Sequence, residues 1–169
     1  MGAMSRNKGA QFEREIAGRL LGLTGVTFKR NLSQTQSAEQ SDLIPDDPDW
    51  PFELELKRYA EGDKCLDAWK AQVSKAAQRT GRIPAVIYRF DRRDTRVCVH
   101  WRAFGETADK WADIDLEGLC YLAGELMADA SLTNSGLGRG VDSPRDRSSR
   151  RTQAAQPLRQ TEKQTEQSE

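Results

Sequence analysis

The sequence has few of the residues on which several common kinds of protein site depend. Its 169 residues include one histidine, His100, and three cysteines, Cys65, Cys98 and Cys120, with no Cys-x-x-Cys spacing. A single histidine excludes zinc hydrolases and ribonucleases that work with several histidines. The cysteine spacing argues against a structural zinc site and a disulfide framework, and it is typical of a reducing cytoplasm. His100 lies in an alternating run, which predicts a strand surface residue rather than a ligand.

Long apolar runs and an excess of charge of one sign are also absent from the sequence. No apolar run is long enough to cross a membrane, and no secretory signal is recognisable, so we expect a cytoplasmic protein. The 26 Lys and Arg residues balance the 26 Asp and Glu residues, which gives a formal net charge of zero. A net charge of zero does not by itself indicate a nucleic-acid-binding protein. The negative charge of an acidic metal site and the positive charge of a basic rim would, however, cancel in the net charge.

The length and composition predict one folded domain over residues 8–130, flanked by unstructured ends. Residues 1–7 are expected to be flexible, and residues 1–3, which precede a second methionine, are set aside as a cloning remnant. Residues 131–169 are rich in Ser, Arg, Gln, Thr and Glu and have few large apolar side chains. They cannot bury enough surface to offset the entropy lost on ordering, so we predict a disordered tail. Its arginines could bind duplex DNA non-specifically or only keep the protein soluble.

Hydrophobic periodicity predicts an alternation of helices and strands along the chain. The predicted helices cover residues 8–23, 66–80 and 116–127, and the predicted strands cover residues 26–30, 41–44, 52–58, 83–90 and 95–101. The polar residues 31–40 are expected to form a mobile loop. Strands in succession near the N-terminus favour a mixed β-sheet flanked by helices, an α/β or α+β fold.

Residues 52–58 alternate strictly between apolar and charged side chains. On a β-strand this alternation places Glu53, Glu55 and Lys57 on one face and the apolar residues on the other. The charged face could simply be solvated, as in many half-buried strands, or it could hold a divalent cation. A hairpin between this strand and residues 41–44 would bring Asp42 to about 5 Å from Glu55.

Asp42, Glu55 and Lys57 are together the residues that a phosphodiester-hydrolysing site needs. Mg²⁺ prefers oxygen ligands, commonly one or two carboxylates together with water and substrate phosphate. Asp42 and Glu55 supply the carboxylates. Lys57 can orient a water or stabilise the charge that builds up on phosphorus.

These residues resemble the signature of a known group of nucleases. Asp42 followed by Glu55-Leu56-Lys57 matches the D…(D/E)xK pattern of the PD-(D/E)xK nuclease superfamily. Residues 8–15 resemble the first-helix signature of archaeal-type Holliday junction resolvases and of similar phage proteins. Gln72 stands where those proteins often carry a glutamine. The resemblance covers residues 8–104 and implies a restriction-endonuclease-like core.

The resemblance implies a role for each residue of the matching motif. Asp42 and Glu55 would ligate Mg²⁺, with Mn²⁺ as an alternative, and the backbone carbonyl of Leu56 would be a third ligand. Lys57 would be the catalytic lysine. Attack on the phosphodiester would be in line and would leave a 5′-phosphate.

Two further residues are implied to act in the site, and one carboxylate is not. Glu13 would reach the site from the first helix and hold a metal-bound water or a second metal. Gln72 would support the site or contact the DNA backbone. Glu53 is a carboxylate that the motif does not require, and we predict that it is a solvated strand residue.

The first functional hypothesis is therefore a Mg²⁺-dependent endodeoxyribonuclease that resembles Holliday junction resolvases. The resemblance implies a homodimer that cuts four-way DNA during recombination, in a bacterial cytoplasm and from a phage gene. One alternative is a flap, nicking or restriction-type nuclease on the same core. Another is a non-catalytic module that binds nucleic acid or protein. Basic residues around the acidic face are predicted to contact the phosphate backbone: Arg6, Lys8, Lys29, Arg30, Arg58, Lys64, Lys70 and Lys75.

Overall fold

The helices and strands of the computed structural model follow the predicted order, with one additional strand. The structure describes residues 3–31 and 41–136, and side chains for residues 7–31 and 41–133, so most of the predicted mobile loop and tail lie outside the described residues. The elements are α1 (Ala3–Thr24), β1 (Phe28–Arg30), β2 (Leu43–Pro45), β3 (Phe52–Tyr59), α2 (Asp67–Thr80), β4 (Ile83–Phe90), β5 (Arg96–His100), the 3₁₀ helix η2 (Trp101–Phe104), β6 (Trp111–Ile114) and α3 (Leu116–Gly136).

The main sheet has four strands in the order β3-β4-β5-β6. β3 and β4 are parallel and are connected through α2, whereas β4 pairs antiparallel with β5, and β5 pairs antiparallel with β6. β1 and β2 form a separate antiparallel pair, with Lys29 opposite Ile44. The predicted mixed β-sheet flanked by helices is thus confirmed. β3 is an edge strand of the main sheet, and its second edge faces the segment that leads into β2.

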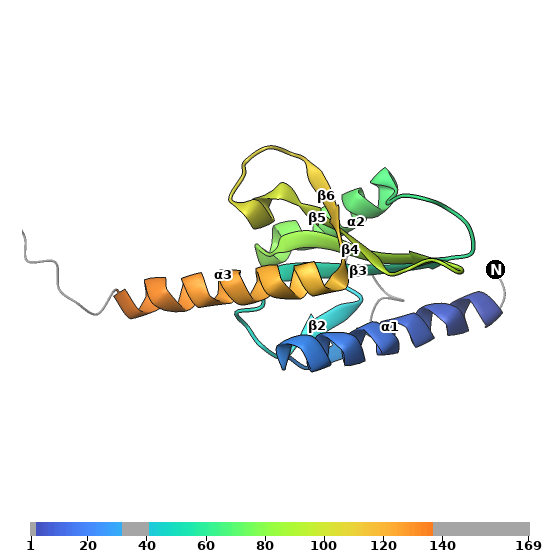
Figure 1. Cartoon of the computed structure of the whole chain (residues 1–169), viewed down its shortest axis with the longest axis horizontal. Helices are drawn as coiled ribbons and strands as arrows, with labels where there is room; N and C mark the ends of the chain where they lie inside the picture. Colours follow the sequence, from blue (N-terminus) through green and yellow to red (C-terminus); the bar gives the residue numbers. More distant parts are fainter. Residues whose placement is uncertain (1–2, 32–40, 137–169) are drawn as a thin grey trace, which may run out of the picture. The chain divides into compact units, whose positions relative to one another are not determined.

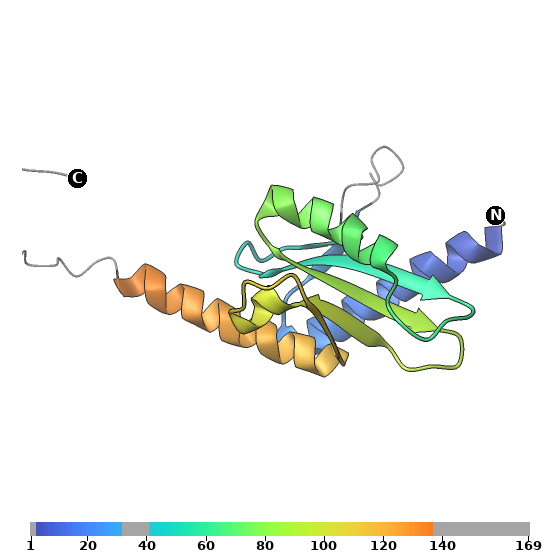
Figure 2. The same cartoon turned by 90° about the horizontal axis from the view of Figure 1, so that it is seen from above.

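Helices cover both faces of the main sheet (Figures 1 and 2). α1 and α3 lie on one face, where Ile16, Leu20 and Leu119 pack with Leu54 and other strand residues in a large hydrophobic cluster. α2 lies on the other face, where its buried residues pack with side chains of β4 and β5 in a second cluster. Both faces of β3 are therefore covered, which is typical of strands in parallel βαβ units.

Two helices are longer than the sequence predicts. α1 begins at Ala3 rather than at residue 8, because the residues before Lys8 include no proline or glycine from Ala3 onward and can continue the helix. α3 extends to Gly136 rather than ending at residue 127, so it passes the predicted domain end at residue 130. The Thr133 hydroxyl donates to the Asp129 carbonyl on this last part. A terminal helix can extend by its own backbone hydrogen bonds without burying apolar surface, which a prediction from burial overlooks.

The predicted hairpin between residues 41–44 and residues 52–58 is wrong in its pairing. β2 pairs with β1 instead, and among the described residues one backbone hydrogen bond, from the Asp42 N–H to the Leu54 carbonyl at 3.1 Å, joins residues 41–44 to β3. The turn before β3 contains Trp50, whose ring packs edge-on against Phe28 and Phe52 at 4.9 and 6.1 Å between ring centroids. The hydrophobic alternation predicts the strands but not their partners, because strand pairing depends on contacts between residues far apart in the sequence.

The single histidine and the three cysteines of the sequence are all buried. Cys65, Cys98 and Cys120 are free and buried, which agrees with the absence of a disulfide framework. His100 is also buried, so its predicted surface position is wrong: its ring packs edge-on against Trp111, and its Nε2 lies 3.2 Å from the Asp109 carboxylate. None of the helices within residues 3–31 and 41–136 is long and apolar enough to cross a membrane.

Candidate active site

Asp42 is held beside the middle of β3 by backbone contacts. Its N–H donates to the Leu54 carbonyl, and its own carbonyl accepts from the Asn31 N–H at 3.0 Å. The Asp42 carboxylate accepts a hydrogen bond from the Leu56 N–H at 2.5 Å. The side chain is buried. Although the ladder is not formed, the predicted approach of Asp42 to the Glu55 segment of β3 is present.

Glu55, Lys57 and Gln72 form a closed ring of hydrogen bonds on the α2 face of β3. The Lys57 Nζ donates to Glu55 Oε1 at 2.5 Å and to Gln72 Oε1 at 3.0 Å. The Gln72 Nε2 donates to the same Glu55 oxygen at 2.7 Å. Glu55 and Lys57 are alternate residues of β3, and Gln72 lies on α2, the helix that follows it. The crossover connection from β3 through α2 therefore brings the three side chains together. The structure thus brings together these three predicted residues.

The Glu55 carboxyl is in a strongly unfavourable place for a negative charge. Its side chain is 3% exposed and that of Lys57 is 18% exposed. Burial first, and the neighbouring Asp42 second, raise the pKa of Glu55 to about 7, although Lys57 acts in the opposite direction. When Glu55 is ionised, it and the Asp42 carboxylate together carry one more negative charge than the Lys57 ammonium neutralises. A cation between them would relieve this repulsion.

The donor set around Asp42 and Glu55 fits a hard divalent cation. In an extended strand the N–H and C=O of one residue point toward the same edge. Because the Leu56 N–H points at Asp42, the Leu56 carbonyl also faces the edge beside Asp42, away from β4. Two carboxylates and one carbonyl are oxygen ligands of the kind that Mg²⁺ prefers, with water or phosphate completing the shell.

Glu13 has a different partner from the one implied by the resemblance. It lies on α1, whose apolar side packs on the face of β3 that carries Leu54 and Leu56. Its carboxylate is bound to the Arg30 Nε at 2.5 Å. Within the described part of the chain, no three His, Cys, Asp or Glu side chains are grouped so as to hold a metal. A metal-linked role for Glu13 therefore stays a prediction.

Glu53 is not the solvated residue that the sequence predicts. It is 3% exposed, and its carboxylate accepts hydrogen bonds from the hydroxyls of Ser41 and Thr80, the latter at 2.9 Å. The prediction failed because α2 covers this face of the strand. Sequence reasoning missed both hydroxyl residues, although Thr80 follows Gln72 by eight residues and therefore lies on the same face of α2.

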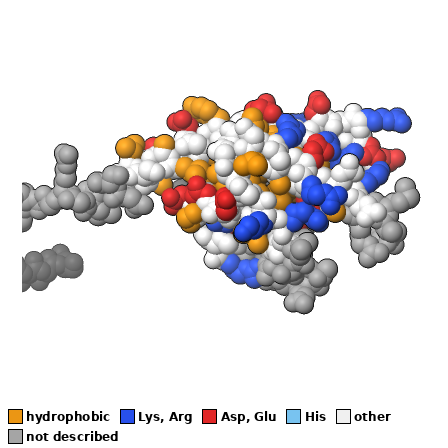
Figure 3. All heavy atoms as spheres, turned by 90° about the horizontal axis from the view of Figure 1, so that it is seen from below, with side chains coloured by type: hydrophobic (Ala, Val, Ile, Leu, Met, Phe, Trp, Pro, Cys, Tyr) orange, Lys and Arg blue, Asp and Glu red, His pale blue; other side chains and the backbone are white. Residues whose placement is uncertain are grey.

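Four of the eight predicted DNA-contacting residues form ion pairs. Lys8 and Arg58 both pair with Asp91, Arg30 pairs with Glu13, and Lys70 pairs with Asp67. Three more are exposed, namely Lys29, Lys64 and Lys75. Arg6 lies in α1, but its side chain is outside the described residues. Figure 3 shows Lys and Arg side chains interspersed with Asp and Glu on one face of the molecule, rather than a continuous basic surface.

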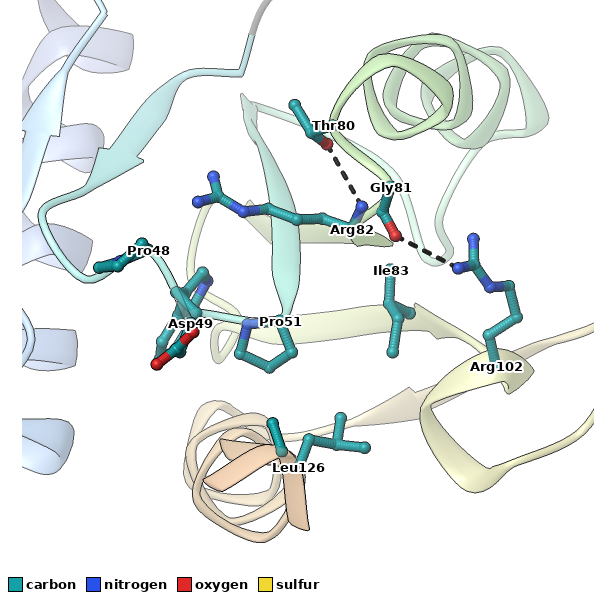
Figure 4. Close-up of a pocket in the computed structure, with 11 residues that line it drawn as sticks. Pro48, Asp49, Pro51, Thr80, Gly81, Arg82, Ile83, Arg102 and Leu126 are labelled. Atoms are coloured by element: carbon teal, nitrogen blue, oxygen red, sulfur yellow. Dashed lines mark hydrogen bonds between the residues drawn. The ribbon is translucent and has the colours of Figure 1, made fainter. Parts of the chain in front are cut away.

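A large cavity lies beside the turn that precedes β3. It has a volume of about 670 Å³ and is lined by residues 48–51 of that turn, by the end of α2 and the start of β4, and by parts of η2 and α3. Figure 4 shows Thr80, Gly81 and Arg82 along one side of it and Leu126 of α3 on the other. None of the predicted catalytic residues lines this cavity. A smaller one, of about 220 Å³, borders Ser41, Glu53 and Thr80.

The chain matches a family model and is similar to solved structures. The family model described as phage putative PDDEXK endonuclease matches residues 4–118. Among solved structures, the chain is similar to Hjc of Archaeoglobus fulgidus, a Holliday junction resolvase from an archaeal hyperthermophile, with 18% sequence identity and a TM-score of 0.46. That match covers 69% of this chain and 98% of the other. Among curated proteins there is no match.

Proposed function

This chain belongs to the family of phage putative PDDEXK endonucleases, and on that premise we propose that it hydrolyses phosphodiester bonds in DNA with the help of a divalent metal ion. The family membership confirms the resemblance to PD-(D/E)xK nucleases. The observation that carries the proposal is the buried ring of Glu55, Lys57 and Gln72, with the Asp42 carboxylate beside it. A merely solvated strand face would have no reason to bury these groups together.

Each residue of the site has a distinct part in the proposed reaction. Asp42, Glu55 and the Leu56 carbonyl would hold Mg²⁺, or Mn²⁺ in its place. When bound, the metal would acidify a water and neutralise charge on the phosphate. The Lys57 ammonium would stabilise the negative charge that develops on phosphorus during in-line attack by water. Gln72 accepts from Lys57 and donates to Glu55, so it would keep the lysine aimed at the reaction centre.

Cleavage assays with matched variants test the proposed catalytic residues. We expect the wild-type protein to nick DNA with Mg²⁺ and to stop when EDTA is added. Lys57→Ala and Glu55→Gln should each lower the rate at least about 100-fold, the cost of losing one group that stabilises the transition state. Lys110→Ala and Glu125→Gln change exposed residues outside the site and should cut at the wild-type rate. Wild-type rates for Lys57→Ala would support a non-catalytic binding module instead.

For the substrate, we propose four-way junction DNA cut by a homodimer. The support is the resemblance of residues 8–15 to the first-helix signature of junction resolvases. A synthetic four-way junction and a linear duplex of the same sequence should be compared side by side, and light scattering should give a mass of two chains. Paired symmetric nicks confined to the junction are expected. Equal cutting of the linear duplex would contradict the junction preference and favour a nicking or restriction-type nuclease.

A further inference from the structure

Tyr59 continues the catalytic face of β3 beyond Lys57. Alternate residues of a strand share one face, so Tyr59 points to the same side as Glu55 and Lys57. It lies two residues, about 7 Å, from Lys57 along the strand. Tyr59 is much less covered than Glu55, because 49% of the whole Tyr59 residue is exposed and only 2% of the whole Glu55 residue. A large aromatic side chain thus meets solvent next to the catalytic residues.

The Tyr59 ring is backed by rigid aromatic side chains. It stacks on Trp69 of α2 with 5.0 Å between ring centroids and 29° between the ring planes. Trp69 is itself buried and packs against Tyr88 and Phe90 at 6.1 and 6.2 Å. The Tyr59 carbonyl accepts from the Asp91 N–H at 3.0 Å, so the backbone is also held. One side of the ring is fixed against the protein, and much of the remainder is open to solvent.

We infer that the Tyr59 ring is a stacking platform for an unstacked nucleobase beside the scissile phosphate. This inference rests on the proposed nuclease function and narrows its substrate. A base can stack on a protein ring only if one of its own faces is open, as it is at a branch point or a strand end. Bases inside a continuous duplex have both faces covered. The ring therefore favours branched DNA over continuous duplex.

Stacking, rather than charge, is the contact that this part of the surface offers. The loop after Tyr59 exposes two acidic side chains, Glu61 and Asp63, and one basic side chain, Lys64. These charges do not favour a phosphate there. Contacts between basic residues and phosphate weaken steeply as salt rises, whereas stacking does not depend on released counterions. The contribution of Tyr59 to affinity should therefore be the same at low and at high salt.

Binding measured without cleavage tests the inference independently of catalysis. The full chain in EDTA is titrated onto a four-way junction that carries 2-aminopurine at the bases next to the branch. We expect Tyr59→Ala to raise Kd by about tenfold, within the range for one base stacked on an aromatic ring, at both 50 mM and 200 mM salt. It should also abolish quenching of the 2-aminopurine. Tyr59→Phe should retain both affinity and quenching, because it keeps the ring.

Tyr121→Ala is the matched control, because Tyr121 is 68% exposed on α3, and it should bind as the wild type does. The inference is overturned if the wild type leaves the 2-aminopurine fluorescence unchanged, or if Tyr59→Ala binds the junction as well as Tyr121→Ala does. The inference is equally overturned if Tyr59→Ala weakens binding to a continuous duplex by the same factor as binding to the junction. It is also overturned if the substitution changes the mass of the protein in solution. Failure of cleavage with intact quenching would instead contradict the proposed nuclease function alone.

Discussion

At the scale of single residues, Glu53 and Glu55 show how two carboxylates on one strand face acquire different surroundings. Both are buried. Glu53 accepts from two neutral hydroxyls, those of Ser41 and Thr80. Glu55 has a charged lysine on one side and the Asp42 carboxylate on the other, and its pKa rises to about 7 through burial and that neighbour. Glu55 is thus the carboxylate whose charge depends on what binds beside it.

The raised pKa of Glu55 predicts a pH dependence of stability in the metal-free protein. Between its ordinary pKa of 4.5 and about 7, the folded state keeps a proton that the unfolded state has released. The free energy of unfolding should therefore fall as pH rises through this window, by about 3 kcal/mol in total, and the contribution is fully present only below pH 4.5. Urea unfolding of wild type and Glu55→Gln in EDTA at several pH values measures it. The Gln variant should lack this slope, and parallel curves would contradict the prediction.

At the scale of elements, the connection between β3 and α2 determines how this strand and this helix meet. Gly62 in this connection has a φ of 144°, and a Cβ there would overlap the ring of Phe90. Gly81, directly after α2, also has a positive φ, 73°, but a Cβ there would meet open space. The Gly81 N–H closes the helix by donating to the Ala77 carbonyl. Both glycines are needed for their backbone conformation, and Gly62 also for its close approach to Phe90.

Alanine at these two glycines should have clearly different costs. Gly81→Ala is expected to lower the free energy of unfolding by about 1 kcal/mol, the cost of a left-handed conformation for a residue with a side chain. Gly62→Ala should cost about 2–4 kcal/mol, because displacement of the buried Phe90 ring adds to the backbone strain. Chemical denaturation of both variants gives the comparison. Equal losses in the free energy of unfolding would show that the connection between β3 and α2 can shift to accommodate a side chain beside Phe90.

At the scale of the whole molecule, the hydrophobic core of the described residues includes side chains from the first half of α3. Leu116, Leu119, Cys120 and Ala123 are buried, and Met127 packs against the same cluster. The family match ends at residue 118, within the first turn of this helix. We therefore propose that the folded domain extends past that point and includes α3 up to Gly136.

Two truncations test this domain boundary. A chain that ends at Gly136 should unfold at the wild-type temperature and retain the wild-type nicking rate, because it keeps every residue of the core cluster. A chain that ends at Gly118 loses three buried side chains of α3. Full burial of one large apolar side chain is worth about 1.5–3 kcal/mol, against a total stability of about 5–15 kcal/mol. This chain should show no cooperative transition in a calorimetric scan, and a normal transition would place the boundary earlier.

The local pattern of the sequence determined most of the element types and which side chains of residues 52–58 share a face. The period-two alternation of residues 52–58 places Glu55 and Lys57 on one face of a strand whatever surrounds it. The spacing of apolar residues likewise predicts the helix α2, on which Gln72 lies. Only the tertiary structure decided which faces are covered. Periodicity says which side chains point the same way, but coverage depends on contacts between residues far apart in sequence. These contacts buried Glu53, paired Glu13 with Arg30, and left Tyr59 exposed at the end of the face that carries Glu55 and Lys57.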